Sequence, residues 1–587
     1  MPPNISANNN TTEDNNITMA TTEERIPLKS GNGYGSLSRK DDDTNKSPNP
    51  GSANNSRKSA YSRRRSESGD NYASKASHVL MKTQTSMLED ARTFAEGSIP
   101  HSMALGTVIG IVCGVASFVY YAILFWILEF VWNDLPQMIV VDKWPEWAYP
   151  LWIPLVGFTM AIGVGVTVIY MGEPGDLPYT IKCVHDDAYV AMSHVMPMVC
   201  ASQFSIIGGG SLGPEAPLVA ICAALGGFIS RKVFKVSERN LVRKHTLMGM
   251  AGALAAFFGC PLGGSLFALE VNSRFGVEYF EHTAEALFSG CICLAVFRQL
   301  ANLPIESIWE ISLPKMENTS ALDVCYGIFL GLIGALVAVV FANLHWKVME
   351  LFQKLDLLRN ERAIWRGLFG SIVVVGLGLL VPHTMFWGEF EFQTISTMSA
   401  ASTLDHIWPT YGLTRFEMDS WWTALIVGLA KMVAISFTVA GGYRGGFIFP
   451  LMATGAAFGR VIYYFFPFIP VQLCCLCMAG AINVGITRTA IATTLILSYL
   501  AGEQNSIAPI LAASLVSLFA TGYMPFIKSQ VLRSDIDVLY DEASDDEEWD
   551  SNHPLHPEGP FFSMPKPENA HHHKVPSQIT TEQQNVV

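Results

Sequence analysis

Charged side chains are scarce in this sequence. Asp, Glu, Lys and Arg make up 15% of the 587 residues, whereas 50% are hydrophobic; an average soluble protein is about one quarter charged. The net charge of −13 is concentrated near the ends, for example in the acidic run YDEASDDEEWD at 540–550. No basic domain with interleaved aromatic residues occurs, so the composition argues against nucleic acid as a partner.

The sequence also lacks a cleaved signal peptide and a metal-binding motif. Its first residues, MPPNISANNNTTEDNN, contain neither a basic segment nor an apolar core, so we expect no leader of that kind. The clustered cysteines Cys474, Cys475 and Cys477 have no acidic or histidine neighbour and are interpreted as buried apolar side chains. The histidine triplet at 571–573 is interpreted as part of a solvated tail, with weak metal binding as the alternative. We therefore expect no metal and no cofactor.

Apolar runs fill the centre of the chain instead. Several approach the roughly 20 residues that span a bilayer, but others are shorter and are broken by Gly or Pro. This pattern predicts an all-α polytopic membrane protein, embedded in lipid, with tilted and discontinuous helices. We expect a disordered cytoplasmic N-terminal tail at 1–92, a membrane domain at 93–530 and an acidic disordered tail at 531–587. Arg and Lys residues between 57 and 65 suit a cytoplasmic location of the first tail.

The membrane domain contains an internal repeat. The segment LGTVIGIVCGVASFVYYAILFWILE at 105–129 is similar to YGIFLGLIGALVAVVFANLHWKVME at 326–350. An interval of 221 residues separates three identical pairs: Gly106 and Gly327, Gly110 and Gly331, and Glu129 and Glu350. GPEAP at 213–217 and GGFIFP at 445–450 supply a second pair of glycine-rich breaks. We predict two inverted halves, at about 95–300 and 321–530, with a ligand site where they meet.

Glu215 is the only charged residue between Phe204 and Ile229. A carboxylate at membrane depth costs roughly 3 kcal/mol on insertion scales, so a function is expected to offset that cost. Helix starts at Ala216 and Phe447 would present unpaired N–H groups, which bind anions. GEPGDLP at 172–178 is a third break, and Arg444 is expected to add positive potential near the second one.

We interpret the three breaks as parts of a path for a small anion. One alternative is that they are ordinary helix breaks in which Glu215 is a first-turn capping residue. Another is an intramembrane hydrolase that uses Glu215 or Ser211, but the sequence has no His-Glu-x-x-His motif and no partnered serine or aspartate motif for such an enzyme. We therefore do not expect an enzyme.

These motifs resemble those of the CLC chloride channel and transporter family over nearly all of residues 95–530. GPEAP is similar to the gating-glutamate motif, GGFIFP to the Gly-x-Phe-x-Pro motif, and CPLGGSLFALEV at 260–271 to the helix after the gate. The resemblance implies a homodimer with one pore per subunit and anion binding by backbone amides. It assigns Glu215 as the gating carboxylate and places the anion at Gly175, Gly213, Glu215, Ala216, Gly446, Phe447 and Ile448.

The sequence also departs from the family pattern. Gly175 stands where the family has an anion-binding serine, Ile527 stands near its central tyrosine, and Tyr523 is out of register. Pro214 replaces the basic residue before the gate, and the C-terminal tail is too short for paired nucleotide-binding regulatory domains. We expect main-chain coordination of chloride and looser selectivity among anions.

The resemblance also bears on proton coupling. Exchangers of the family carry an inner proton-transferring glutamate at the position of Val271, one residue after Glu270. Valine carries no proton, so we predict a channel gated by Glu215, with a chloride/proton antiporter as the alternative. Glu270 is interpreted as a structural hydrogen-bonding residue.

The sequence leaves the host membrane open, either the plasma membrane or an internal vacuolar or endosomal one. The basic segment RKVFKVSERNLVRK at 231–244 is expected to be a solvated rim. Asn318, in the linker between the halves, starts an Asn-Thr-Ser acceptor triplet and is expected on the face opposite the N-terminal tail.

Overall fold

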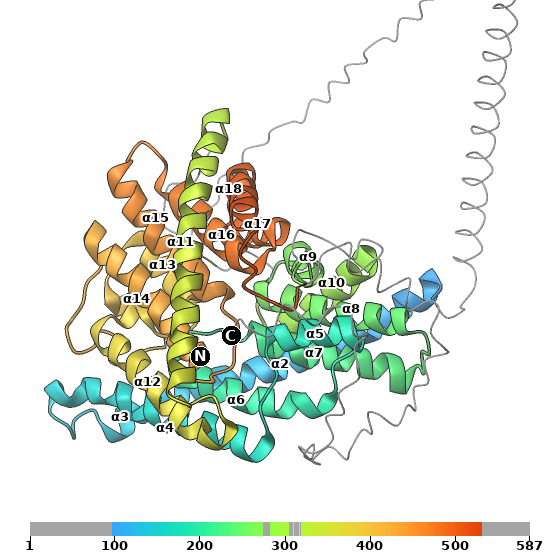
Figure 1. The fold of residues 1–587 in the computed structure, drawn as a ribbon, viewed down its shortest axis with the longest axis horizontal. Coiled ribbons are helices and arrows are strands. Elements are labelled where there is room, and N and C mark those ends of the chain that lie inside the picture. Colours follow the sequence, from blue (N-terminus) through green and yellow to red (C-terminus); the bar gives the residue numbers. More distant parts are fainter. Residues whose placement is uncertain are drawn as a thin grey trace, which may run out of the picture. The chain divides into compact units, whose positions relative to one another are not determined.

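The computed structural model describes residues 97–273, 282–304, 309, 316, 318–404 and 406–530. These residues form helices joined by turns and contain no β-strand, only an isolated bridge. Both predicted tails lie outside them. Figure 1 shows the helices, which are α2 (Ile99–Glu129), α3 (Leu135–Ile139), α4 (Trp152–Met171), α5 (Leu177–Asp186), α6 (Val195–Ile207), α7 (Glu215–Phe228), α8 (Arg239–Phe258), α9 (Pro261–Glu270), α10 (Thr283–Ala301), α11 (Ala321–Lys354), α12 (Ala363–Leu380), α13 (Glu389–Thr397), α14 (Trp421–Ala440), α15 (Ile448–Phe465), α16 (Val471–Thr487), α17 (Ala490–Leu500) and α18 (Ile507–Ala520).

The helices confirm a multi-pass membrane protein. Within the described part of the chain, 8 apolar helical stretches are long enough to cross a bilayer, and four others are shorter. The longest single helix, α11, has 34 residues, whereas α17 has 11. Helices of such unequal length match the tilted and discontinuous arrangement expected from the sequence. Cys474, Cys475 and Cys477 lie buried in α16, as predicted.

The same packing order occurs in both halves of the chain. α7 packs on α8, α8 on α10, and α2 on α10; correspondingly, α15 packs on α16, α16 on α18, and α11 on α18. The paired glycines explain the close contact of the long helices. A Cβ atom at Gly110 would lie 2.9 Å from the Ser289 carbonyl oxygen on α10, and one at Gly331 would lie 2.7 Å from the Ala513 carbonyl oxygen on α18. Small residues that let backbones approach are what helix packing in lipid requires.

The basic segment at 231–244 is not a solvated rim throughout, so that prediction is wrong for three of its residues. Arg231, Arg243 and Lys244 are all buried. The Arg243 Nε atom donates to the Val184 carbonyl at 2.9 Å, at the C-terminal end of α5, and Lys244 pairs with Glu285 at 3.3 Å. The negative end of a helix thus compensates Arg243, a nearby carboxylate compensates Lys244, and Arg231 lies over the Tyr189 ring.

Candidate functional site

The two glycine-rich breaks lie against each other where the halves meet. Gly213 and Gly446 exchange a pair of backbone hydrogen bonds, each 2.7 Å long, in an antiparallel bridge. α7 begins at Glu215 and α15 at Ile448, within one residue of the expected starts. The bridge therefore fixes the first turn of one helix beside the first turn of the other.

Glu215 extends from the first half to the helix start of the second. The Ile448 N–H donates to its Oε1 atom at 3.0 Å, and the side chain is 1% exposed. Its Oε2 atom accepts no hydrogen bond from the described residues. The carboxylate therefore lies where the free N–H groups of α15 favour negative charge, and it is not a cap of its own helix alone.

Glycine is required on both sides of this carboxylate. A Cβ atom at Gly213 would lie 2.0 Å from Glu215 Oε2, and one at Gly446 would lie 2.2 Å from Glu215 Cγ. Both distances are far below van der Waals contact, so any larger residue would displace the Glu215 side chain. The two predicted glycines thus leave the space that the Glu215 carboxylate occupies.

The remaining predicted residues of the second break differ in their exposure. Ala216 and Ile448 are buried, whereas Phe447 is half-buried and packs edge-on against Phe526, with ring centroids 5.9 Å apart. Ile527, which follows Phe526, is buried, whereas Tyr523 is 75% exposed. The end of the described chain thus contacts the second break through the ring of Phe526. Neither Ile527 nor the exposed Tyr523 supplies a hydroxyl there.

The third break supplies carboxylates that pair with Arg444 of the second break. Gly175 precedes Asp176, whose Oδ1 atom accepts the Tyr179 N–H at 2.9 Å and caps α5. Arg444 forms ion pairs with Glu173 and, at 3.8 Å, with Asp176. Carboxylates of the third break therefore offset the positive potential expected from Arg444, and one of them, Glu173, also pairs with Arg366 at 3.2 Å. This pairing ties the third break to the second.

Glu270 and Val271 lie away from this arrangement, at the end of α9. The two carboxylate oxygens of Glu270 accept the N–H groups of Ile491 at 3.2 Å and Ala492 at 2.8 Å. Glu270 thus caps the start of α17, where backbone N–H groups are otherwise unpaired. Val271 is fully buried, and its carbonyl accepts a hydrogen bond from Gln530 at 3.0 Å.

Two buried polar groups of the membrane domain were not predicted from the sequence. The Tyr120 hydroxyl bonds to the Ser202 hydroxyl at 2.8 Å. Glu389 at the start of α13 accepts the Trp387 Nε1–H at 2.8 Å. Tyr120 lies in an apolar run with no distinguishing signal, but the sequence GEFEF at 388–392 places two carboxylates between apolar segments and could have indicated Glu389.

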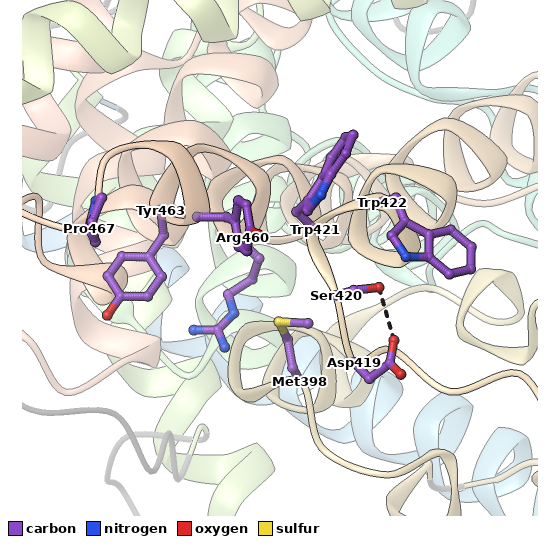
Figure 2. A pocket seen from close by; sticks show the side chains of 9 residues that line it. Met398, Asp419, Ser420, Trp421, Trp422, Arg460, Tyr463 and Pro467 are labelled. Carbon is purple, nitrogen blue, oxygen red and sulfur yellow. Dashed lines mark hydrogen bonds between the residues drawn. The ribbon is translucent and has the colours of Figure 1, made fainter.

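A separate cavity lies between the start of α14 and the end of α15, and Figure 2 shows the side chains that line it. It has a volume of about 500 Å³, and none of the residues predicted to bind an anion lines it. Its wall combines aromatic, charged and small side chains: Met398, Asp419, Ser420, Trp421, Trp422, Arg460, Tyr463, Tyr464 and Pro467. This cavity is therefore separate from the site of Glu215.

Comparison with known proteins agrees with this architecture. The chain is 24% identical over 405 residues to YfeO of Escherichia coli, whose name assigns it to ion transport; the match covers 68% of this chain and 86% of that protein. Among solved structures, a CLC-type fluoride/proton antiporter superposes with a TM-score of 0.57 at 18% identity and covers 75% of this chain and 100% of its own. A slow cyanobacterial Cl⁻/H⁺ antiporter gives 0.59 at 17% identity, with 76% and 98% covered.

The model of one protein family, described as voltage gated chloride channel, matches residues 175–522. This range contains Glu215, both glycine-rich breaks GPEAP and GGFIFP, and the third break from Gly175 onward, and it spans more than half of the 587 residues. The protein therefore belongs to the voltage gated chloride channel family, the CLC proteins, and is an integral membrane anion transporter.

Proposed function

We propose that the protein conducts chloride or another small anion past the start of α15, and that Glu215 gates this path. The observation that carries the proposal is the hydrogen bond from Ile448 N–H to Glu215 Oε1, 3.0 Å long, in a buried site between the two halves. A helix start in that position attracts a negatively charged group. The carboxylate and a small anion would compete for the same N–H groups.

The gate would work by exchange between these two occupants. The ionised carboxylate accepts the Ile448 N–H and excludes an anion. Once protonated, Glu215 loses its negative charge and its electrostatic attraction to the helix start, so it moves away and an anion replaces it. The Gly213–Gly446 bridge holds the backbone in place during this exchange, and Ala216, Phe447 and Gly175 flank the proposed path.

We further propose passive flow of anions, without stoichiometric proton coupling. Val271 offers no proton-accepting group at the inner position, and both oxygens of its neighbour Glu270 are engaged by backbone N–H groups of α17. A carboxylate used as a helix cap is poorly placed to carry protons. The chloride/proton antiporter is the second candidate, because the superposed structures are named as antiporters.

Reconstituted protein separates the two mechanisms. Purified protein in liposomes is given an outward chloride gradient, and a pH-sensitive dye reports proton movement. A channel gives anion flux that a potassium ionophore accelerates, with no uphill proton movement. Sustained uphill pumping that is lost in Glu270→Gln would instead make the protein an exchanger.

The gate itself is tested with Glu215→Gln, which keeps the shape of the side chain but cannot ionise. We expect flux that is nearly independent of external pH, because the variant resembles a permanently protonated gate. If the variant retains the pH dependence of the wild type, Glu215 is not the gate. The family resemblance implies a homodimer with one path per subunit. Light scattering should then give the mass of two chains, and each path should be fully active without the other.

A further inference from the structure

The cavity between α14 and α15 lies where two membrane-spanning helices end. α14 begins at Trp421, α15 ends at Phe465, and both helices are long and apolar enough to cross a bilayer. The ends of such helices lie at the boundary between hydrocarbon and water. The cavity therefore opens at the depth of the lipid headgroups, and its volume of about 500 Å³ is that of a small-molecule site.

Aromatic side chains line this cavity and continue onto the surface around it. Trp421, Trp422, Tyr463 and Tyr464 belong to its wall, and Trp421 packs edge-on against Phe465 with ring centroids 5.4 Å apart. Trp422, Tyr464 and Phe465 are each at least half exposed. Exposed rings at this depth contact acyl chains with their apolar bodies and headgroups with their N–H or O–H groups. The rim of the cavity therefore favours a lipid over a soluble ligand.

The cavity also contains a cation that no carboxylate compensates. Arg460 of α15 is half-buried and forms no ion pair with any residue that the structure describes, whereas Arg366 and Arg444 both pair with Glu173. Its Nε atom is buried without a hydrogen-bond partner there, and its guanidinium group lies 5.6 Å from the centre of the Tyr463 ring. A buried N–H without an acceptor is unfavourable, and a planar guanidinium group suits phosphate oxygens.

A carboxylate lies across the same cavity from this cation. Figure 2 shows Asp419 and Ser420 on one side and Arg460 with Tyr463 on the other. The Ser420 hydroxyl donates to Asp419 Oδ1 at 2.9 Å, which holds the exposed carboxylate just before α14. Asp419 is not paired with Arg460, so the cavity presents two separate charges of opposite sign. A ligand that carries both a negative and a positive group would match them.

We propose that this cavity binds the headgroup of a zwitterionic phospholipid, with the phosphate on Arg460 and the ammonium group beside Asp419. The faces of Trp421 and Trp422 also attract an ammonium group, and the acyl chains extend past the exposed rings into the hydrocarbon. A free inorganic anion would leave Asp419 and these rings without a partner. An anionic phospholipid would match Arg460 but would be repelled by Asp419. This inference does not depend on the gating function of Glu215.

The test measures lipid binding to the whole chain, purified in detergent and freed of native lipid, by native mass spectrometry. The probes are dioctanoyl phosphatidylcholine, dioctanoyl phosphatidylglycerol, dioctanoylglycerol and inorganic phosphate. We expect phosphatidylcholine to bind at least about threefold more tightly than phosphatidylglycerol, which shares the phosphate but has no ammonium group. Dioctanoylglycerol and inorganic phosphate should bind at least about tenfold more weakly, because each lacks one part of the ligand.

Substitutions then locate the binding site. Arg460→Gln retains a hydrogen-bonding amide but removes the charge, and it should weaken phosphatidylcholine binding by at least about tenfold. Asp419→Asn still accepts the Ser420 hydroxyl and should bring the affinity for phosphatidylcholine down to that for phosphatidylglycerol. Arg415→Gln is the matched control, because Arg415 also lies over a tyrosine ring, 5.4 Å from the centre of Tyr411, but does not line the cavity. Its lipid binding should equal that of the wild type.

Each outcome supports or overturns the proposal. Wild-type binding of phosphatidylcholine by folded Arg460→Gln refutes it, and so does an equal loss in Arg415→Gln, because the effect would then be one of general surface charge. If Arg460→Gln does not fold, the exposed Asp419 decides, since an unchanged preference for phosphatidylcholine in Asp419→Asn refutes recognition of the ammonium group. Binding of inorganic phosphate as tight as that of phosphatidylcholine would show an anion site and no lipid site.

Discussion

Replacing Gly446 with alanine should push the Glu215 carboxylate out of its position without altering any ionisable group. The added Cβ atom would lie 2.2 Å from Glu215 Cγ, 2.3 Å from Cδ and 2.5 Å from Oε1. Carbon atoms in contact are about 3.5–4.0 Å apart, so the two side chains overlap by more than an ångström. Gly446 has no positive φ, which means that its backbone accepts alanine and the overlap is the main effect.

The size of the effect follows from the contact that is lost. The Ile448 N–H to Glu215 Oε1 bond joins a backbone donor to a charged acceptor, and such bonds contribute roughly 1.5–3 kcal/mol. At about 1.4 kcal/mol for each factor of ten, the population with the carboxylate at the helix start falls by roughly 10- to 150-fold. At a pH where the wild-type gate is mostly closed, anion flux should rise by at least about tenfold.

The assay is chloride efflux from liposomes between pH 4.5 and 7.5, with elution from a sizing column as the check on folding. Gly376→Ala is the matched control, because Gly376 lies in α12 and a Cβ atom there has no neighbour within 4 Å. Its flux and pH dependence should equal those of the wild type. Combined with Glu215→Gln, the Gly446→Ala change should add little, since that gate is already open.

A single result would refute the reasoning. If Gly446→Ala folds and its flux follows pH as that of the wild type does, then the helix start of α15 is not the closed position of Glu215. A loss of flux in Gly446→Ala that Glu215→Gln does not restore would show that the alanine blocks the path itself.

Three further predictions follow from other parts of the structure. Glu270→Gln should lower the free energy of unfolding by about 1–3 kcal/mol, because one of the two α17 N–H groups that bond to Glu270 is left unpaired. Thermal unfolding in detergent measures this loss, and flux per folded protein should not change. Gly175→Ser on its own would place a Cβ atom 2.4 Å from the Tyr179 ring, so the added hydroxyl is tested in a Tyr179→Ala background. There, chloride should be preferred over nitrate roughly 2- to 10-fold more strongly. An unchanged reversal potential would count against Gly175 as part of the path. Asn318 is exposed just before α11, and we expect it to carry a glycan on the face opposite the N-terminal tail. The glycan would appear as a gel mobility shift that is absent in Asn318→Gln. Labelling of residue 318 from the same face as the tail would contradict the inverted halves.

Much of the fold was already determined by local features of the sequence. Apolar runs with few charges have to lie in lipid, and in lipid only helices satisfy every backbone group. Repeated glycines in α2 and α11 predicted the close packing of the long helices, since they leave no side chain between two backbones. GPEAP and GGFIFP predicted where two helices start, and the isolated charge of Glu215 marked one of them as functional.

Contacts between distant segments were decided only by the tertiary structure. No local signal indicated that Glu215 would accept a hydrogen bond from Ile448, because the two residues are 233 positions apart and meet only through the Gly213–Gly446 bridge. Arg444 was expected to add positive potential near the second break, but Glu173 of the other half pairs with it and offsets its charge. Nothing in the sequence indicated that Lys431 would donate to the Phe386 carbonyl, 45 positions away. Electrostatic energy depends on distance in space, and a sequence records only distance along the chain.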